Sequence, residues 1–522
     1  MWGKIHWYHY MRIIKTHEIP SLEALDDWTA SQVYNGLDCC VTREVLDAIE
    51  PQLDEHTRGT YDFERELQGP ILEMRLRGVA IDLERRDQVI EEYADMVERL
   101  EQQLERIVGE GLDYWGWSWR SPKDLRELFF SILNIPRGVR GSVDHHALER
   151  INSYFVAKPI VSHLLALREL QKKIDVLRTE IDTDARIRTS YNIAGTNTGR
   201  LSSSFSEFGT GTNLQNIEES LRSIFIADPG YKLAYFDCEQ GESREVGAIE
   251  WNLFNDGRYL DACETGDLHT SVAKLVWPNL PWTGDLKADR ELAERRYFRH
   301  YDRRFMCKKI GHGTNYGGKP PTLAQEAEVE VGLVREFQPL YYKRFPAKQR
   351  WFEWTDSELR RRGYLVTLRG RKRWFFGRRD DNATLREALA YQAQSSLADY
   401  LDRGMLNVWR GRSCQLLMQI HDAILVQFKE RDEDDVVQHI REQLEYAIPL
   451  NGGRMFSIPY GVKTGWNWGN VLYDRDGKVI GNPDGLKTYH PGDKRERKPP
   501  TSLLDRRFYR THRSFSPYAR NI

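Results

Sequence analysis

The sequence predicts an α+β fold, on two observations. Residues 82–110 and 159–181 alternate charged and apolar positions with helical spacing, whereas residues 231–239 and 415–428 are aromatic-rich or strongly apolar and read as strands. The strand segments lie far apart in the chain, and the sequence between them is again mostly helical. We therefore expect a sheet assembled from distant strands with a helical insertion between them.

The individual elements carry their own signals. Between Tyr61 and about residue 187 the chain reads as a helical region, in which Ser121 is a candidate N-cap followed by Pro122 at the first helical position. The apolar segments QLLMQI and AILVQF flank the two residues His421 and Asp422, which predicts a β-hairpin with these residues at its tip. Beyond Gly469 the composition shifts to Gly, Pro, Asp and Arg, which indicates an irregular appendage.

Composition excludes several classes of protein. The 522 residues carry a formal net charge of -2 and are 40% hydrophobic and 11% aromatic, which is typical of a globular chain with several structural units. No stretch approaches the roughly 20 apolar residues of a membrane helix, and the first residues do not resemble a signal peptide. Six cysteines without a CxxC pair indicate a reducing compartment. We expect a cytoplasmic protein with no membrane partner.

Basic charge is distributed unevenly. Residues 360–379 (RRRGYLVTLRGRKRWFFGRR) contain nine Lys or Arg and no Asp or Glu, and a second basic cluster ends at Lys309. Residues 471–522 carry twelve Lys or Arg against six Asp or Glu. Basic residues mixed with aromatics suit a nucleic-acid backbone and its bases, although any single run of this kind also suits a solvated charged face.

Two aspartates are candidates for metal binding. Asp237 follows a strand-like segment, and Asp422 lies in the predicted hairpin tip, where a carboxylate is also typical of an ordinary turn. Brought within about 4 Å, the two would repel by roughly 4 kcal/mol at an effective dielectric constant of about 20, so their juxtaposition would require a cation. Two such carboxylates can hold two Mg²⁺ ions, which activate a hydroxyl and stabilise in-line phosphoryl transfer.

One candidate helix combines cations and rings. In RRFMCKKIGHGTNYGG, the residues Arg304, Lys308, His312 and Tyr316 recur every four positions and would share one helix face. This order would suit a triphosphate at one end and a base at the other. An amphipathic helix that ends at glycine explains the same pattern without a ligand.

Four motifs in order carry a family resemblance. They are NTGRLSSSFSEFGTGTNLQNI at 197–217, DCEQGESR at 237–244, RRFMCKKIGHGTNYGG at 303–318 and QIHDAILVQ at 419–427. Together they resemble the motifs of the family A DNA polymerases, of the bacterial DNA polymerase I type or a phage replicative member. Weaker likenesses, among them GDLHT and GYLVTLRGRKR, extend the match over roughly residues 61–469.

The resemblance implies a right-hand polymerase, with an antiparallel palm sheet and helical fingers and thumb. It implies a template-directed DNA polymerase that binds primer-template DNA and dNTPs. The expected divisions are 1–60 as an exonuclease-like remnant, 61–190 as thumb, 191–250 and 363–470 as palm, 251–362 as fingers, and 471–522 as a basic C-terminal extension.

The resemblance also implies roles for single residues. Asp237 and Asp422 would hold two Mg²⁺ ions, for which Mn²⁺ could substitute, with the main-chain carbonyl of Cys238 as a further ligand. Lys308 would contact the triphosphate and protonate departing pyrophosphate. The other implied nucleotide-binding residues are Arg304, His312, Tyr316, Glu242, His269 and Gln240, with Glu242 crowding a ribose 2′-OH. The implied DNA-binding residues are Arg200, Asn213, Gln215, Arg386, Gln394 and His421.

The chain also departs from the family pattern. His312 stands where the family usually has Phe or Tyr, Ala423 replaces the usual Glu after His-Asp, and Ala390 replaces an Asn. The spacer between Leu201 and Asn213 is longer than usual and rich in Ser and Gly, which predicts a mobile loop near the primer-template.

The N-terminal segment YNGLDCCVTREVL, with Tyr34 and Asp38, resembles the last motif of the family's 3′-5′ proofreading exonuclease. The earlier exonuclease motifs have no visible match, so we expect a remnant, or one piece of an exonuclease completed by a separate chain, with Asp38 not catalytic by itself. An ordinary loop and helix start is the alternative.

Two other functions stay open on the sequence. One is a primer-template DNA-binding protein with impaired catalysis, motivated by His312 and Ala423. The other is a polymerase whose exonuclease also works. A separate exonuclease or processivity subunit is a candidate partner.

Overall fold

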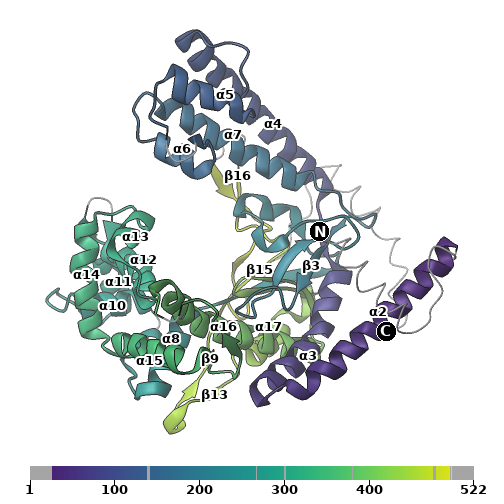
Figure 1. Cartoon of the computed structure of the whole chain (residues 1–522), viewed down its shortest axis with the longest axis vertical. Helices are drawn as coiled ribbons and strands as arrows, with labels where there is room; N and C mark the ends of the chain where they lie inside the picture. The colour runs from purple at the N-terminus through teal and green to yellow at the C-terminus, as the bar shows by residue number, and fades with distance from the viewer. Residues whose placement is uncertain are drawn as a thin grey trace. The chain divides into compact units, whose positions relative to one another are not determined.

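Strands from three distant parts of the chain form one central sheet. The computed structural model describes residues 26–137, 141–265, 267–298, 301–378, 380–473, 478–493 and 495 (Figure 1). The chain divides into two compact units, the first up to Phe63 together with 370–372, and the second comprising the remainder. The secondary structure mixes long helices with antiparallel strands, so the predicted α+β class is confirmed.

The first unit is helical over its described residues. It contains α2 (Asp27–Ile49), η2 (Glu50–Gln52) and the beginning of α3 (Glu55–Arg77). The side chain of Asp26 caps α2 by accepting a hydrogen bond from the Thr29 amide at 3.0 Å. Tyr34 and Asp38 lie in the middle of α2, so their segment is not a loop and helix start. The exonuclease remnant itself stays a prediction.

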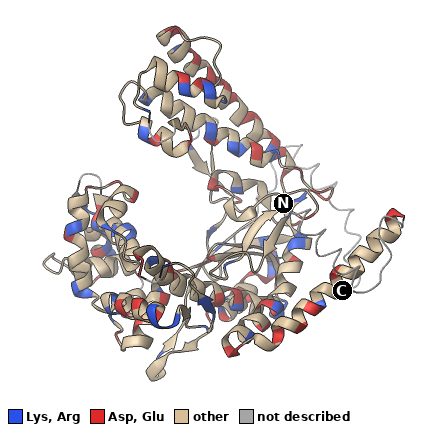
Figure 2. Cartoon of the chain, in the orientation of Figure 1, with Lys and Arg blue, Asp and Glu red and all other residues tan. Residues whose placement is uncertain are grey.

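The helical region expected after residue 61 is present. Its elements are α3, α4 (Leu83–Glu105), η3 (Arg106–Glu110), α5 (Pro122–Glu127), η4 (Leu128–Ile132), α6 (His145–Ile151) and α7 (Lys158–Leu177). Ser121 caps α5 as predicted, because its hydroxyl accepts from the Asp124 amide. Apolar residues of α4 and α7 share one buried core. Both signs of charge are interspersed on these helices (Figure 2).

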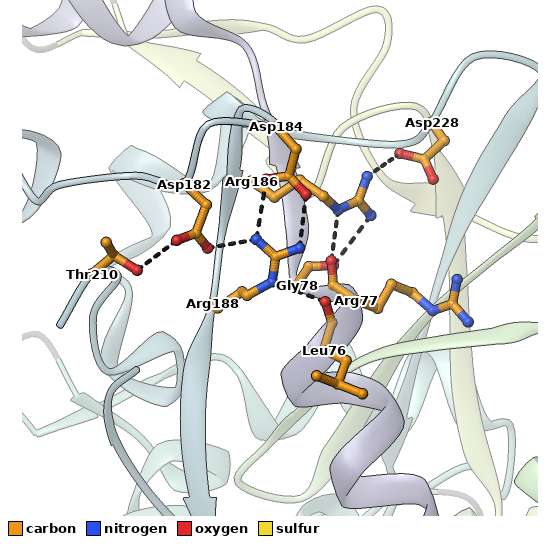
Figure 3. A network of polar contacts seen from close by, with 9 residues as sticks. All are labelled: Leu76, Arg77, Gly78, Asp182, Asp184, Arg186, Arg188, Thr210 and Asp228. Carbon is orange, nitrogen blue, oxygen red and sulfur yellow. Dashed lines mark hydrogen bonds and ion pairs between the residues drawn. The ribbon is translucent and has the colours of Figure 1, made fainter. Parts of the chain in front are cut away.

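Two arginines tie the root of this region to the rest of the second unit (Figure 3). Strands β1 (Val79–Ile81), β2 (Arg186–Ile187) and β5 (Phe225–Ile226) form a small sheet where the helical region begins and ends. Arg186 donates to the carbonyl of Arg77 at 2.7 Å and to Asp228 at 2.6 Å. Arg188 donates to the carbonyl of Leu76 at 2.8 Å. These bonds satisfy carbonyls at the C-terminus of α3 that the helix leaves unpaired.

The central sheet has the antiparallel order β11-β12-β6-β15-β18. Its strands are β6 (Tyr231–Cys238), β11 (Gln415–Ile420), β12 (Ala423–Lys429), β15 (Tyr460–Gly465) and β18 (Lys487–Thr488). Strands β11 and β12 form the predicted hairpin around His421 and Asp422. The strand β6, which precedes them by nearly 200 residues, lies between β12 and β15.

The chain between β6 and β11 is mostly helical, as predicted. Its elements are α8 (Gly241–Phe254), α9 (Arg258–Glu264), α10 (Leu268–Val276), α11 (Leu286–Ala293), β7 (Arg296–Phe298), β8 (Tyr301–Asp302), α12 (Arg303–Asn315), α13 (Pro320–Glu326), α14 (Val331–Arg344), α15 (Ala347–Arg362), β9 (Tyr364–Val366), β10 (Lys372–Trp374) and α16 (Asn382–Gly411). Helix α16 packs against α8 and against α17 (Glu433–Leu444). A buried core spans α8 to α15.

The sheet continues beyond residue 470. After β13 (Ile448–Pro449), β14 (Met455–Phe456) and β15, the chain forms β16 (Val471–Tyr473), β17 (Val479–Gly481) and β18. Strand β18 pairs with β15, and the buried side chain of Asn482 bonds to Asn467 at 2.8 Å. The expected irregular extension therefore contributes an edge strand to the central sheet, although its residues after 495 lie outside the described part.

Ion pairs neutralise much of the basic run at 360–379. Six of the nine basic residues in 360–379 form ion pairs with carboxylates, so much of this charge is neutralised within the described fold. No helix among the described residues is long and apolar enough to cross a membrane.

Candidate active site

The register of the central sheet brings the two predicted aspartates together. Ala423 pairs directly with Asp237 across β12 and β6, and Asp422 immediately precedes Ala423. The Cys238 amide donates to the carbonyl of Asp422 at 3.1 Å, which continues the pairing into the hairpin tip. His421 adopts a left-handed conformation with φ of 51°, which lets the two-residue tip turn tightly. Two residues 185 positions apart in the chain are therefore neighbours at one end of the sheet.

Both carboxyl groups are electrostatically unsatisfied. Burial, and after it the charge of Asp422, raises the pKa of Asp237 above its ordinary value. Burial also raises the pKa of Asp422, and Arg200 offsets this only in part, with its Nη2 3.7 Å from Asp422 Oδ1. No described Lys, Arg or His lies within ion-pair distance of Asp237. A divalent cation is the group that this pair of carboxylates fits, with the Cys238 carbonyl as the further predicted ligand.

A cavity of about 380 Å³ lies beside the aspartates. Seven of the predicted residues line it, namely Cys238, Gln240, Glu242, His269, Lys308, His312 and Asp422. These residues come from β6, α8, α10, α12 and the hairpin tip, so the fold gathers them from five separate elements. Asp237 does not line the cavity. It lies one residue before Cys238, and its side chain reaches solvent at the end of the sheet although the surrounding protein still partly desolvates its carboxyl group.

Helix α12 presents the predicted row of cations and rings. Arg304, Lys308 and His312 lie within the helix, and Tyr316 follows it as the C-cap. Lys308 and His312 are exposed to the cavity, and the His312 and Tyr316 rings meet edge to face at 5.5 Å. Of the two glycines in the helix, Gly313 is required by packing, because a Cβ there would collide with Leu323 of α13.

Glu242, at the start of α8, contacts four other polar side chains of this site. Its carboxylate accepts from the Tyr316 hydroxyl at 2.5 Å and from Gln394 at 3.5 Å. Arg200 approaches it at 3.5 Å and His312 at 3.8 Å. One carboxylate thus joins residues that the sequence assigned separately to nucleotide and DNA binding. Burial and Glu242 together raise the pKa of Tyr316, which keeps its hydroxyl protonated as a donor.

His269 lines the cavity, whereas Arg304 of α12 does not. Arg304 donates to Asp267 at 3.2 Å, and Asp267 also caps α10 through the Thr270 amide. Burial, with Arg304 next in importance, lowers the pKa of His269 to about 4. His269 is therefore neutral at pH 7 until an anion enters the cavity.

A second polar row runs from the hairpin tip along β4 (Ser202–Phe205) and η6 (Leu214–Asn216). The Gln215 amide donates to Gln419 at 2.7 Å, and the Gln419 amide donates to the His421 carbonyl at 2.6 Å. The Ser203 hydroxyl donates to Asn213 at 2.5 Å and lies 3.0 Å from Gln215. Arg386 is set apart, because it precedes Gln394 by eight residues, or about 12 Å, along α16.

Three residues of these networks were not singled out in the sequence. Asp267 holds Arg304, Gln419 bridges Gln215 to the hairpin tip, and Ser203 orders Asn213. Two of them carry a local signal, because Asp267 lies in GDLHT and Gln419 opens QIHDAILVQ. Ser203 is one serine of three in a row, and only the strand pairing distinguishes it.

Comparison with known proteins defines the class of this site. A family model described as DNA polymerase family A matches residues 84–470. The thermostable DNA polymerase I of Thermus caldophilus is 27% identical over 431 residues, covering 78% of this chain and 47% of that protein. DNA polymerase I of Mycobacterium bovis is 26% identical over 446 residues, covering 80% and 46%. The chain thus spans about half the length of the curated relatives it matches.

A solved structure agrees with the sequence comparisons. The polymerase domain of Pol1 from M. smegmatis, in complex with DNA primer-template and dNTP, superposes with a TM-score of 0.62 at 27% identity, covering 77% of this chain and 69% of that one. The chain belongs to DNA polymerase family A, as the motif resemblance predicts. The members of this family are metal-dependent enzymes.

Proposed function

We propose that this protein is a template-directed DNA polymerase that adds dNTPs to a primer 3′-OH. The observation that carries the proposal is the β6–β12 register, which sets Asp237 beside Asp422 in a chain of this family. The primer hydroxyl attacks the α-phosphate of the dNTP, a new phosphodiester bond forms, and the bond to the leaving pyrophosphate breaks. The relatives named DNA polymerase I and the neighbour solved with primer-template and dNTP support this assignment.

The carboxylates of Asp237 and Asp422 and the Cys238 carbonyl would hold two Mg²⁺ ions, with Mn²⁺ as an alternative. When bound, these ions activate the attacking hydroxyl and stabilise the negative charge of phosphoryl transfer. The chain itself supplies the hard oxygen ligands and the uncompensated charge that favour such ions over Lys or Arg.

The cavity residues would bind the incoming nucleotide. Arg304, Lys308 and His269 face the triphosphate, and Lys308 donates a proton to the departing pyrophosphate. His312 and Tyr316 lie beside the base and sugar, with Gln240 at the start of α8. Glu242 would exclude a ribose 2′-OH, because Tyr316 and Gln394 hold its carboxylate in place.

The second polar row would bind primer-template DNA. Asn213, Gln215 and His421 belong to this row, Arg200 and Gln394 would contribute from their contacts with Glu242, and Arg386 would contact DNA further along α16. Side chains of this kind in the minor groove test base-pair geometry more than sequence, because the acceptors there are nearly the same for every pair. The base pairs themselves then select the nucleotide.

The assignment of regions is part of the proposal. Residues 61–190 would be the thumb, 191–250 and 363–470 the palm, and 251–362 the fingers. Residues 1–60 would be the exonuclease remnant, completed by a separate exonuclease chain if it functions at all. The six free cysteines suit a reducing compartment such as the cytoplasm.

A catalytically impaired DNA-binding protein is the second candidate, and the buried Ala423 opposite Asp237 is the observation in its favour. The deciding experiment is extension of a primed template by the purified chain with dNTPs and Mg²⁺. We expect extension with dNTPs, little with rNTPs, and no degradation of a mismatched 3′ end without dNTPs. Salt-sensitive binding of the primed template without extension would instead establish the second candidate.

A further inference from the structure

Two phenylalanines are displayed on the turn that follows β4. Phe205 ends β4 and is 66% exposed, and Phe208 lies in the turn and is 60% exposed. This turn belongs to the spacer before Asn213 that is longer than is usual in the family. A single exposed apolar residue needs no explanation, but two bulky ones on a constrained backbone indicate a contact surface.

The turn has a defined conformation. The Ser206 amide donates to the Thr210 carbonyl at 2.9 Å, and the Gly209 amide donates to the Ser206 carbonyl at 3.1 Å. Gly209 and Gly211 have φ of 81° and 75°, values that favour glycine. A Cβ on Gly211 would collide with the Arg188 carbonyl oxygen, so the chain passes directly against that segment. The spacer, which the Ser and Gly content predicts to be mobile, thus contains a hydrogen-bonded turn.

The turn is also fastened to the root of the helical region. Thr210 donates to Asp182 at 2.7 Å, and Asp182 accepts from Arg188 at 2.5 Å, as Figure 3 shows. Arg75 of α3 forms an ion pair with Glu207, one of the two residues between the phenylalanines. Each rigid attachment lowers the entropy lost when the phenylalanines meet a partner.

The position of the turn points to DNA as that partner. Phe205 lies two residues after Ser203, so both side chains emerge on the same face of β4. Ser203 bonds to Asn213 and Gln215, which the proposed function places along the primer-template minor groove. The face of β4 that carries Phe205 therefore continues the proposed DNA surface, and Phe208 is exposed in the turn three residues further along the chain.

Local charges favour an apolar mode of contact. Glu207 is paired with Arg75, and Asp182 and Asp184 are paired with Arg188, so no carboxylate of this network is left to repel phosphates. The same pairing leaves no excess of positive charge to attract them. Phenylalanine side chains can instead contact sugars and base edges in the minor groove or wedge between base pairs.

We propose that Phe205 and Phe208 form an apolar contact with the minor groove of the product duplex behind the primer terminus. The proposal rests on the proposed function, because that function supplies the DNA. This apolar contact would contribute to DNA affinity independently of salt concentration. Contacts of Arg200 and other cations with DNA would depend on salt.

The test measures the Kd of the full chain for a primed template by fluorescence anisotropy at several salt concentrations. We expect Phe205→Ala/Phe208→Ala to raise Kd roughly tenfold, with an unchanged slope of log Kd against log salt. Phe205→Leu/Phe208→Leu retains apolar area and is expected to recover part of the loss. Met455→Ala, which removes a side chain 56% exposed on β14, is the matched control and should leave Kd unchanged.

Three outcomes overturn the inference: an unchanged Kd for the double alanine variant, a changed salt slope, or an equal loss for single-stranded DNA. If the double alanine variant unfolds, Phe208→Ala alone gives the same decision with about a threefold expected change in Kd. Extension by the wild-type chain at saturating DNA reports the proposed function separately. Wild-type extension with no effect of the variants on Kd would refute the phenylalanine contact alone.

Discussion

Two regions of the molecule differ in how the charge of their carboxylates is compensated. In the region of α8 and α15, Glu250 is fully buried 2.8 Å from Lys348, whose ammonium also lies 3.3 Å from the centre of the Tyr259 ring. At the end of the central sheet, Asp237 and Asp422 are neighbours, and within the described fold their ion-pair contact with a cation is that of Arg200 with Asp422 at 3.7 Å. The first carboxylate has its counter-ion within the folded chain, although burial still raises the pKa of Glu250 and lowers that of Lys348, whereas the second arrangement still requires positive charge.

The difference distinguishes a structural carboxylate from a functional one. A buried ion pair has its desolvation cost offset by its own partner, so it holds two elements together. The charges of Asp237 and Asp422 are compensated only weakly, so their raised pKa values indicate that they destabilise the free protein. Binding of a cation removes this destabilisation. Four experiments test this contrast.

Replacing either site aspartate should abolish activity without harming the fold. Asp237→Ala and Asp422→Ala are each expected to lower the single-turnover extension rate by about 10³-fold or more, because charge stabilisation by bound metal is worth several kcal/mol. The free energy of unfolding should stay the same or rise, since a repulsion is removed. The neighbouring Glu239→Ala is the control and should change the rate less than about threefold. If either aspartate variant lost as much stability as a substitution in the core, the aspartate would have a structural role and the proposed contrast with Glu250 would be wrong.

Replacing the lysine of the buried Glu250–Lys348 pair should instead destabilise the fold. Lys348→Met leaves the Glu250 carboxylate buried without a partner, so we expect the free energy of unfolding in urea to fall by about 3 kcal/mol or more. Lys343→Met, at an exposed position of α14, should change it by less than about 0.5 kcal/mol. Adding Glu250→Leu to Lys348→Met should restore part of the loss. Equal stability of wild type and Lys348→Met would show that the pair is not structural.

Magnesium should act on the site carboxylates alone. Without DNA, Mg²⁺ at ten times its Kd is expected to stabilise the wild-type chain by about 1.4 kcal/mol, measured as a shift in thermal unfolding relative to EDTA. Asp237→Asn/Asp422→Asn should show no shift. A shift of the same size in that variant would place the ion elsewhere in the chain.

The fourth experiment concerns the pH dependence of stability. Burial, opposed by Arg369 at 2.7 Å, raises the pKa of Glu245 to about 7 from an ordinary value of 4.5. The folded state then retains a proton that the unfolded state releases, so this group's contribution to stability falls as pH rises from about 4.5 through 7. Urea unfolding of Glu245→Gln should therefore lose stability less steeply over this range than wild type. Glu430→Gln, at an exposed position, should follow the wild-type slope.

Much of the local structure could be predicted because its causes are local. The Ser121 cap, the helix over 82–110 and the hairpin around Asp422 follow from neighbouring residues. The pairing of Asp237 with Asp422 was inferred only from the family motifs, since no local pattern sets the order of β12 and β6. The partners of the basic run at 360–379 were not predicted: three of its arginines pair with Asp356 or Glu358 on the same helix, whereas Arg369 pairs with the distant Glu245.

The sequence by itself determined the family, the chemical types of the site residues and the elements that carry them, because motifs and helix or strand periodicity are properties of short segments. Only the tertiary structure decided the cavity lined by five elements, the network around Glu242, the edge strand β18 and the hydrogen-bonded turn that follows Phe205 and contains Phe208. Each of these depends on contacts between residues tens to hundreds of positions apart, and such contacts form only when burial and strand pairing select one arrangement of the whole chain.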